Sequence, residues 1–181
     1  MNRLVLAVAL AALTACGAPP PNPAYGPVLP NGAHALTLKQ LGVIGPNDLG
    51  PDVIASTSLA QVRDAVITHA RYSQVCSTGA GPADRCWQNV PDSPGYVYVA
   101  VITNIECNRP VEETTGIGGN TLYFIHWVGQ PRGVCDLMMA LATWRLYSVS
   151  RSMLPSSGKL TVRLEMQGNA TGAVESQVQL T

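Results

Sequence analysis

The sequence contains few charged side chains. Asp, Glu, Lys and Arg make up 12% of the chain, compared with about a quarter in typical globular proteins. The 11 basic residues balance the 11 acidic ones, so the chain lacks the excess of positive charge that nucleic-acid binding requires. We therefore expect no nucleic-acid partner, and a surface whose polarity comes mainly from Ser, Thr, Asn, Gln and Gly.

Residues that commonly carry catalysis or bind metals are also scarce. The chain has 3 histidines and no Gly-x-Ser-x-Gly motif, which would hold a nucleophilic serine on a strained turn. It also lacks a Cys-x-x-Cys pair and a histidine pair at helical spacing. We assign no catalytic residue from the sequence and expect neither a metal site nor a cofactor.

The N-terminus has the features of an export signal. Arg3 precedes an apolar run at residues 4–12 that is too short to span a bilayer, which needs about 20 residues. Leu-Thr-Ala at residues 13–15 then leads directly to Cys16. An ordinary secretory signal with an incidental cysteine remains the alternative interpretation.

Residues 13–16 resemble the lipobox of bacterial lipoproteins. The resemblance implies that residues 1–15 are a signal peptide and that Cys16 becomes diacylated and forms the new N-terminus. Two acyl chains satisfy the requirement for stable membrane anchoring. Gly17 is not the aspartate that favours inner-membrane retention in this family. We therefore expect a cell-envelope location: the outer membrane in a bacterium with two membranes, or the outer face of the plasma membrane in one with a single membrane.

Setting Cys16 aside for lipid leaves an even set of cysteines: Cys76, Cys86, Cys107 and Cys135. An even set in an exported chain predicts two disulfides. The short, turn-rich separation of Cys76 and Cys86 favours pairing them, which leaves Cys107 for Cys135. The other two pairings remain open.

A proline-rich segment follows the proposed anchor. Its prolines fall close together and favour an extended conformation: Pro19, Pro20, Pro21, Pro23, Pro27 and Pro30. We interpret residues 16–35 as a tether and residues 36–181 as a single disulfide-stapled domain. Docking of this segment on the domain from Tyr25 onward remains an alternative.

The domain alternates between strand-like and turn-like segments. Strand-like patterns occur at residues 35–41, 52–56, 96–103, 121–128, 159–167 and 175–180, and within 135–152. A helix is predicted at residues 59–72 with Ser58 as its N-cap. Residues 96–103 are apolar on both faces, which indicates a central strand covered on both sides. The prediction is mainly β: an antiparallel β-sandwich or barrel-like domain with one short helix early in the domain.

Two further segments are predicted to be irregular. Residues 42–51 contain Gly-Pro-Asn, which is typical of a turn. Residues 116–120 are glycine-rich but lack the lysine that follows in a phosphate-binding loop, so we interpret them as a chain reversal. Glu106, Glu112 and Glu113 are interpreted as a solvated acidic loop between strands rather than as paired catalytic carboxylates.

The tryptophans Trp87, Trp127 and Trp144 and the tyrosines are candidates for a binding groove, because aromatic side chains are favoured at interfaces. The leading functional hypothesis is a membrane-anchored, non-enzymatic envelope lipoprotein that binds a protein or an envelope component. A small protease-inhibitor or assembly-factor module is one alternative. An envelope hydrolase that uses His126 or His69 is the other.

Overall fold

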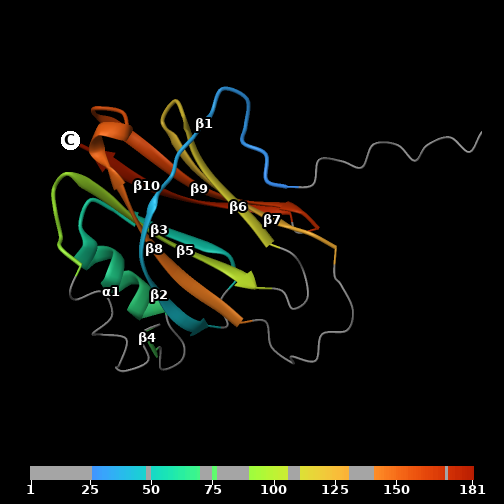
Figure 1. Cartoon of the computed structure of the whole chain (residues 1–181). Helices are drawn as coiled ribbons and strands as arrows, with labels where there is room; N and C mark the ends of the chain where they lie inside the picture. Colours follow the sequence, from blue (N-terminus) through green and yellow to red (C-terminus); the bar gives the residue numbers. More distant parts are fainter. Residues whose placement is uncertain are drawn as a thin grey trace, which may run out of the picture.

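Two β-sheets pack face to face in this protein, with an α-helix on the outer face of one of them (Figure 1). The structure, a computed structural model, describes residues 26–47, 50–69, 75–76, 90–105, 111–130, 141–169 and 171–181. The predicted mainly β fold with one early helix is confirmed, and the two sheets give it the layered arrangement of a sandwich.

The described strands divide equally between the sheets. Sheet A contains β1 (His34–Ala35), β6 (Val111–Gly118), β7 (Thr121–Val128), β9 (Gly158–Gly168) and β10 (Gly172–Leu180), in the order β1-β6-β7-β9-β10. Sheet B contains β2 (Lys39–Asn47), β3 (Asp52–Ser56), β4 (Val75–Cys76), β5 (Tyr96–Ile105) and β8 (Leu141–Ser150), in the order β3-β5-β8-β2-β4. Neighbouring strands are antiparallel except β7 and β9, which are parallel.

The main core lies between the sheets. Strand alternation sends every second side chain inward, and the buried set includes Val97, Val99, Val101, Leu122, Phe124, Val149, Leu160, Val162 and Leu164. The strand predicted at residues 159–167 is confirmed as part of β9, and its Leu160, Val162 and Leu164 lie in this core. β10 lies at the edge of sheet A.

A second core lies on the other face of sheet B, beneath α1 (Leu59–His69). The backbone N–H of Gln61 bonds to the Ser58 hydroxyl at 3.4 Å, consistent with the predicted N-cap. Val62 and Val66 of the helix are fully buried, as are Ala100 and Ile102 of β5. β5 is therefore a central strand covered on both faces, as its apolar sequence predicted.

The prediction of a turn at residues 42–51 is wrong for its first half, because β2 continues to Asn47. Its pairing with β8 is irregular at two places, between Gln40 and Gly42 and between Ile44 and Asn47. Proline has no N–H to donate to a ladder, but an irregular register between Ile44 and Asn47 leaves room for Pro46. The Gly-Pro-Asn segment at residues 45–47 is thus part of a strand with an irregular register.

The prediction of a solvated loop at Glu112 and Glu113 is also wrong, because both residues belong to β6. β6 pairs with β7 along its whole length, and the register closes at Gly118 and Thr121. The reversal is therefore confined to Gly119 and Asn120. Gly119 has a φ of 55°, a conformation that glycine adopts without steric cost.

The described part of the predicted tether lies on sheet A. The side-chain amide of Gln167 donates to the carbonyl of Val28 at 2.9 Å and accepts from its N–H at 2.9 Å. Residues 34–35 pair with β6 as β1, and Leu36 donates from its N–H to the carbonyl of Thr115 at 2.8 Å. From residue 26 onward the observed arrangement is therefore the docked alternative, and we call residues 26–35 the strap.

Several predicted features lie outside the described residues: Cys16, Cys86, Cys107, Cys135 and Glu106. Cys76 ends β4 at the edge of sheet B, and the two disulfides stay predictions. Within the described residues, no helix is long and apolar enough to cross a membrane.

The strap gives a test at Gly116. A Cβ atom there would lie 2.7 Å from the His34 carbonyl oxygen and 2.7 Å from Leu29 Cδ1, too close for a backbone contact to relax cheaply. We expect Gly116→Ala to lower the free energy of unfolding in urea by about 1–3 kcal/mol. Gly50→Ala, where no atom lies within 4 Å of the new Cβ, is the control. Equal stability of the two variants would contradict tight docking of the strap.

Candidate functional site

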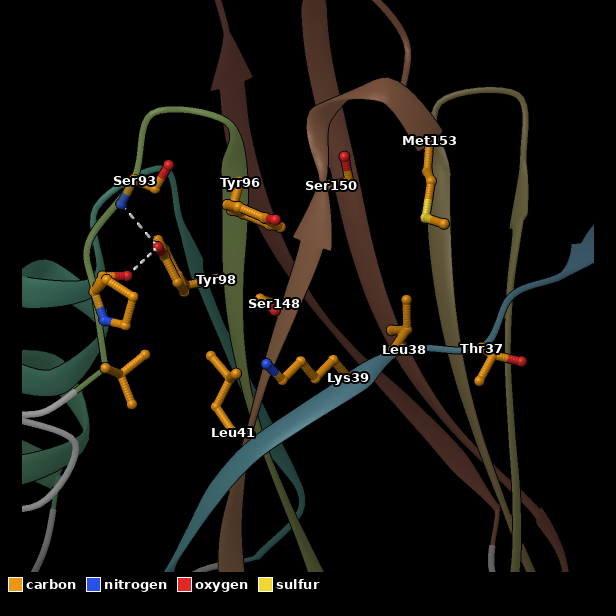
Figure 2. Close-up of a pocket in the computed structure, with 12 residues that line it drawn as sticks. Thr37, Leu38, Lys39, Leu41, Ser93, Tyr96, Tyr98, Ser148, Ser150 and Met153 are labelled. Carbon is orange, nitrogen blue, oxygen red and sulfur yellow. Dashed lines mark hydrogen bonds between the residues drawn. The ribbon is translucent and has the colours of Figure 1, made fainter.

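An open groove of about 310 Å³ lies on sheet B, on the face that also carries α1 (Figure 2). It is lined by Thr37, Leu38, Lys39, Leu41, Val90, Pro91, Ser93, Tyr96, Tyr98, Ser148, Ser150 and Met153. We call it the Tyr96 groove. Its size is near the lower end of the range for small-molecule sites, about 300–1,000 Å³.

Strand register builds the floor of the Tyr96 groove. Ser148 of β8 pairs with Lys39 of β2 on one side and with Tyr98 of β5 on the other. The next row along the same face pairs Ser150 with Tyr96. Because alternate residues of a strand share a face, five side chains from three strands converge on one rigid surface.

Tyr98 fixes one wall of the groove. Its phenol donates to the carbonyl of Pro91 at 2.8 Å and accepts from the N–H of Ser93 at 2.9 Å, as the dashed lines in Figure 2 mark. The residue is only 1% exposed, and burial raises the pKa of Tyr98, with the nearby charge of Asp92 acting in the same direction. The phenol thus remains a neutral donor that holds residues 91–93 against the sheet.

The rim of the groove carries exposed apolar side chains. Tyr96 is 40% exposed and Met153, at the end of the short 3-10 helix Arg151–Met153, is 48% exposed. Figure 2 shows both side chains beside Ser150, at the same end of the groove. A concave apolar surface with a few convergent polar groups is the usual character of a binding site.

A second site candidate is a charged cluster between the two sheets. Nδ1 of His126 donates to Oε1 of Glu113 over 2.8 Å, and these two residues are cross-strand partners on β7 and β6 of sheet A. Arg145, on β8 of sheet B, bonds to both carboxylate oxygens of Glu113 through its two terminal nitrogens. Arg145 also donates to the Thr103 hydroxyl of β5 at 2.8 Å. The cluster therefore links the sheets.

Glu113 is held in its ionised form within this cluster. Burial opposes ionisation, but the hydrogen bond from His126 and the charge and hydrogen bonds of Arg145 outweigh it, so the pKa of Glu113 lies below its ordinary value. Bidentate arginine–carboxylate pairs are among the stronger polar contacts in proteins. A carboxylate satisfied in this way is a cross-link between sheets.

The geometry does not favour His126 as a general base. A hollow of about 360 Å³ borders Glu113, His126 and Arg145, but His126 is only 2% exposed. Its Nε2 is buried and has no hydrogen-bond partner among the described residues. A general base must come within hydrogen-bond reach of the proton that it removes, so we interpret the cluster as a structural clasp.

The other predicted site residues do not converge. Trp144 is fully buried beneath α1 and belongs to the core, where no partner can reach it. Trp127 is half-buried on β7 of sheet A, while Trp87 lies outside the described residues. His69 is the last residue of α1, far along the chain from the clasp. No group of three potential metal-binding side chains occurs in the described residues.

The sequence analysis included the tyrosines among the groove candidates, and two of them, Tyr96 and Tyr98, line the groove. It missed Lys39 and Met153 as groove residues. One signal was present: Tyr96 and Tyr98 alternate with valine at the start of β5, so both rings share a face. Comparisons of the chain with known protein families, curated proteins and solved structures find no match. The site is therefore interpreted from its own geometry.

The clasp makes folding stability depend on pH. Because the pKa of Glu113 is below its ordinary value of 4.5 in the folded protein, its ionised form contributes stability above that value. The contribution is lost as the pH falls through the folded-state pKa. We expect Glu113→Gln to lower the free energy of unfolding near neutral pH, and the difference from wild type to shrink on acidification below about pH 4.5.

Thr103→Val is the matched control for this measurement. It removes a hydrogen bond to Arg145 without removing a titrating group, and should cost about 1 kcal/mol at every pH. Urea unfolding at several pH values compares the two variants. A Glu113→Gln deficit that is independent of pH would contradict the clasp.

Proposed function

We propose that this protein is a bacterial envelope lipoprotein, anchored by lipid on Cys16, that binds a protein or an envelope component without catalysing a reaction. The observation that carries the binding role is the Tyr96 groove, with Tyr96 and Met153 exposed at its rim. The anchor rests on the resemblance of residues 13–16 to a lipobox, and the non-catalytic role is supported by the burial of His126.

The fold suits a fixed, pre-formed binding surface. The floor of the groove comes from β2, β5 and β8, which are hydrogen-bonded to one another in sheet B. A ligand that docks there would meet side chains already ordered by the sheet, which lowers the entropic cost of binding.

The strap shows at which end of the sandwich the described chain begins relative to the groove. Val28 bonds to Gln167, which pairs with Trp127 near the end of β7, whereas Tyr96 and Met153 lie at the opposite end of the sandwich. In Figure 1 the strap begins on the right, while the start of β5 and the segment that holds Met153 lie on the left. The described part of the chain therefore begins at the end of the sandwich opposite the groove.

The anchor is tested by changing Cys16 to serine, which cannot receive the diacylglyceryl group through a thioether. We expect Cys16→Ser to move the protein from the membrane fraction to the soluble fraction of cells that express the full chain. Wild-type protein made in the same cells is the control. Continued association of the variant with membranes would refute lipid anchoring.

Binding through the groove is tested by site-specific photo-cross-linking in intact cells. We expect a photoreactive phenylalanine analogue at Tyr96 to form a discrete adduct, and Met153→Asp in the same chain to abolish it. The same analogue at Val28, which is 56% exposed on the other sheet, is the control. Identical adducts from both positions, or none from Tyr96, would reject the groove as the binding site.

A further inference from the structure

We propose that the ligand of the Tyr96 groove is an extended peptide segment of a partner protein, with an acidic side chain that pairs with Lys39. This inference rests on the proposed function and names its ligand class. Three observations carry it: the charge of the groove, the free edge of β2 and the position of the groove relative to the strap.

The charge of the groove is that of a single cation. Lys39 is the one basic side chain among the twelve residues that line it, and no acidic side chain is among them. Lys39 forms no ion pair with another described residue. Figure 2 shows its ammonium end turned over the floor of the groove, on the side of Ser148 and Leu41. An anionic group seated there would gain a partner that the protein itself does not supply.

The side chains around Lys39 are mainly apolar, so a ligand that pairs with Lys39 must also present apolar surface. Leu38, Leu41 and Met153 border the groove together with the ring of Tyr96. Serine hydroxyls at positions 148 and 150 add hydrogen-bonding groups to the floor. A segment with an acidic side chain between apolar ones matches this arrangement of one charge within an apolar surface.

Among ligands that carry one negative charge and apolar surface, the unpaired backbone edge of β2 favours an extended peptide. β2 pairs with β8 on one side, but on its other side it pairs with β4 only at Ile44 and Gly45. Within the described residues, the backbone of Lys39 and Leu41 therefore has an unpaired edge beside the groove. An extended peptide can add to such an edge through main-chain hydrogen bonds, while its side chains enter adjacent pockets.

The position of the groove disfavours a lipid headgroup. The Tyr96 groove and the first described residue of the strap lie at opposite ends of the sandwich (Figure 1). A lipid anchor at Cys16 would join the described domain at the end opposite the groove. A partner protein that presents an acidic segment from the other side is the occupant that fits.

The test uses two fluorescent hexapeptide libraries and the chain from residue 16 onward, which includes the whole strap. Both libraries carry random apolar residues, with glutamate at the third position in one and glutamine in the other. We expect wild type to bind the glutamate library about two- to five-fold more tightly, the range of a partly exposed ion pair. Lys39→Met should equalise the two affinities, and Lys39→Glu should reverse the preference.

Two variants serve as controls. Lys159→Met changes the only other lysine of the chain, on sheet A, and should keep the preference for glutamate. Tyr96→Ala should weaken binding of both libraries by the same factor. Circular dichroism of each variant excludes loss of the fold as the cause.

The outcomes separate this inference from the proposed function. Equal binding of both libraries by wild type would overturn the role of Lys39 while leaving the groove as a binding site. Lys39-dependent binding to phosphatidylglycerol vesicles, without peptide binding, would overturn the peptide in favour of a lipid. Absence of library binding, together with absence of an adduct at Tyr96, would reject the proposed function itself.

Discussion

Burial of β5 and β8 on both faces is the constraint on which the rest of the structure depends. Val97, Val99 and Val101 of β5 pack toward sheet A, while Tyr98, Ala100 and Ile102 pack toward α1. These two strands are therefore the middle layer of a three-layer arrangement, and each must have an apolar cover on both sides. Among the described residues, the eleven-residue helix α1 packs over Ala100, Ile102 and Trp144 on this face. Toward the start of β5, the same face carries tyrosine and serine side chains, and these line the Tyr96 groove.

The clasp resolves a related problem at the other end of the sandwich. Arg145 and Thr103 lie on the inward face of sheet B, where their neighbours on the same strands are apolar. A charge in that position is costly unless it is paired and hydrogen-bonded. Glu113 supplies the pairing from the opposite sheet, and His126 supplies a further hydrogen bond. Two sheets can bury their apolar faces against each other in many relative positions. The directional bonds among Glu113, His126 and Arg145 form only when the two sheets are aligned as observed.

The sequence predicted what depends on local pattern and missed what depends on pairing. The apolar run of β5, the alternation of β9 and the N-cap at Ser58 are local, and each led to the observed element. The residues around Glu113 have the polar composition of a loop. Glu113 nevertheless belongs to a strand, because it pairs with His126 across the ladder, and to the clasp, because it also bonds to Arg145 of the other sheet. The Tyr96 groove depends in the same way on Lys39, Tyr96 and Met153, which are distant in the chain. Trp144 illustrates the converse, since a residue type common at interfaces is here a core residue.

The two ends of the sandwich are thus built for different purposes. At the strap end, the side-chain amide of Gln167 bonds to both the N–H and the carbonyl of Val28, as a neighbouring strand would. The clasp links the two sheets near the same end. The carboxylate of Glu113 is bonded there by both His126 and Arg145. At the groove end, the Tyr98 phenol secures residues 91–93, and the Tyr96 ring lies 6.4 Å from the Tyr98 ring, centroid to centroid. Lys39, by contrast, forms no ion pair with another described residue. The proposed peptide ligand would supply a negative charge for this cation and an apolar surface for the exposed rim at Tyr96 and Met153.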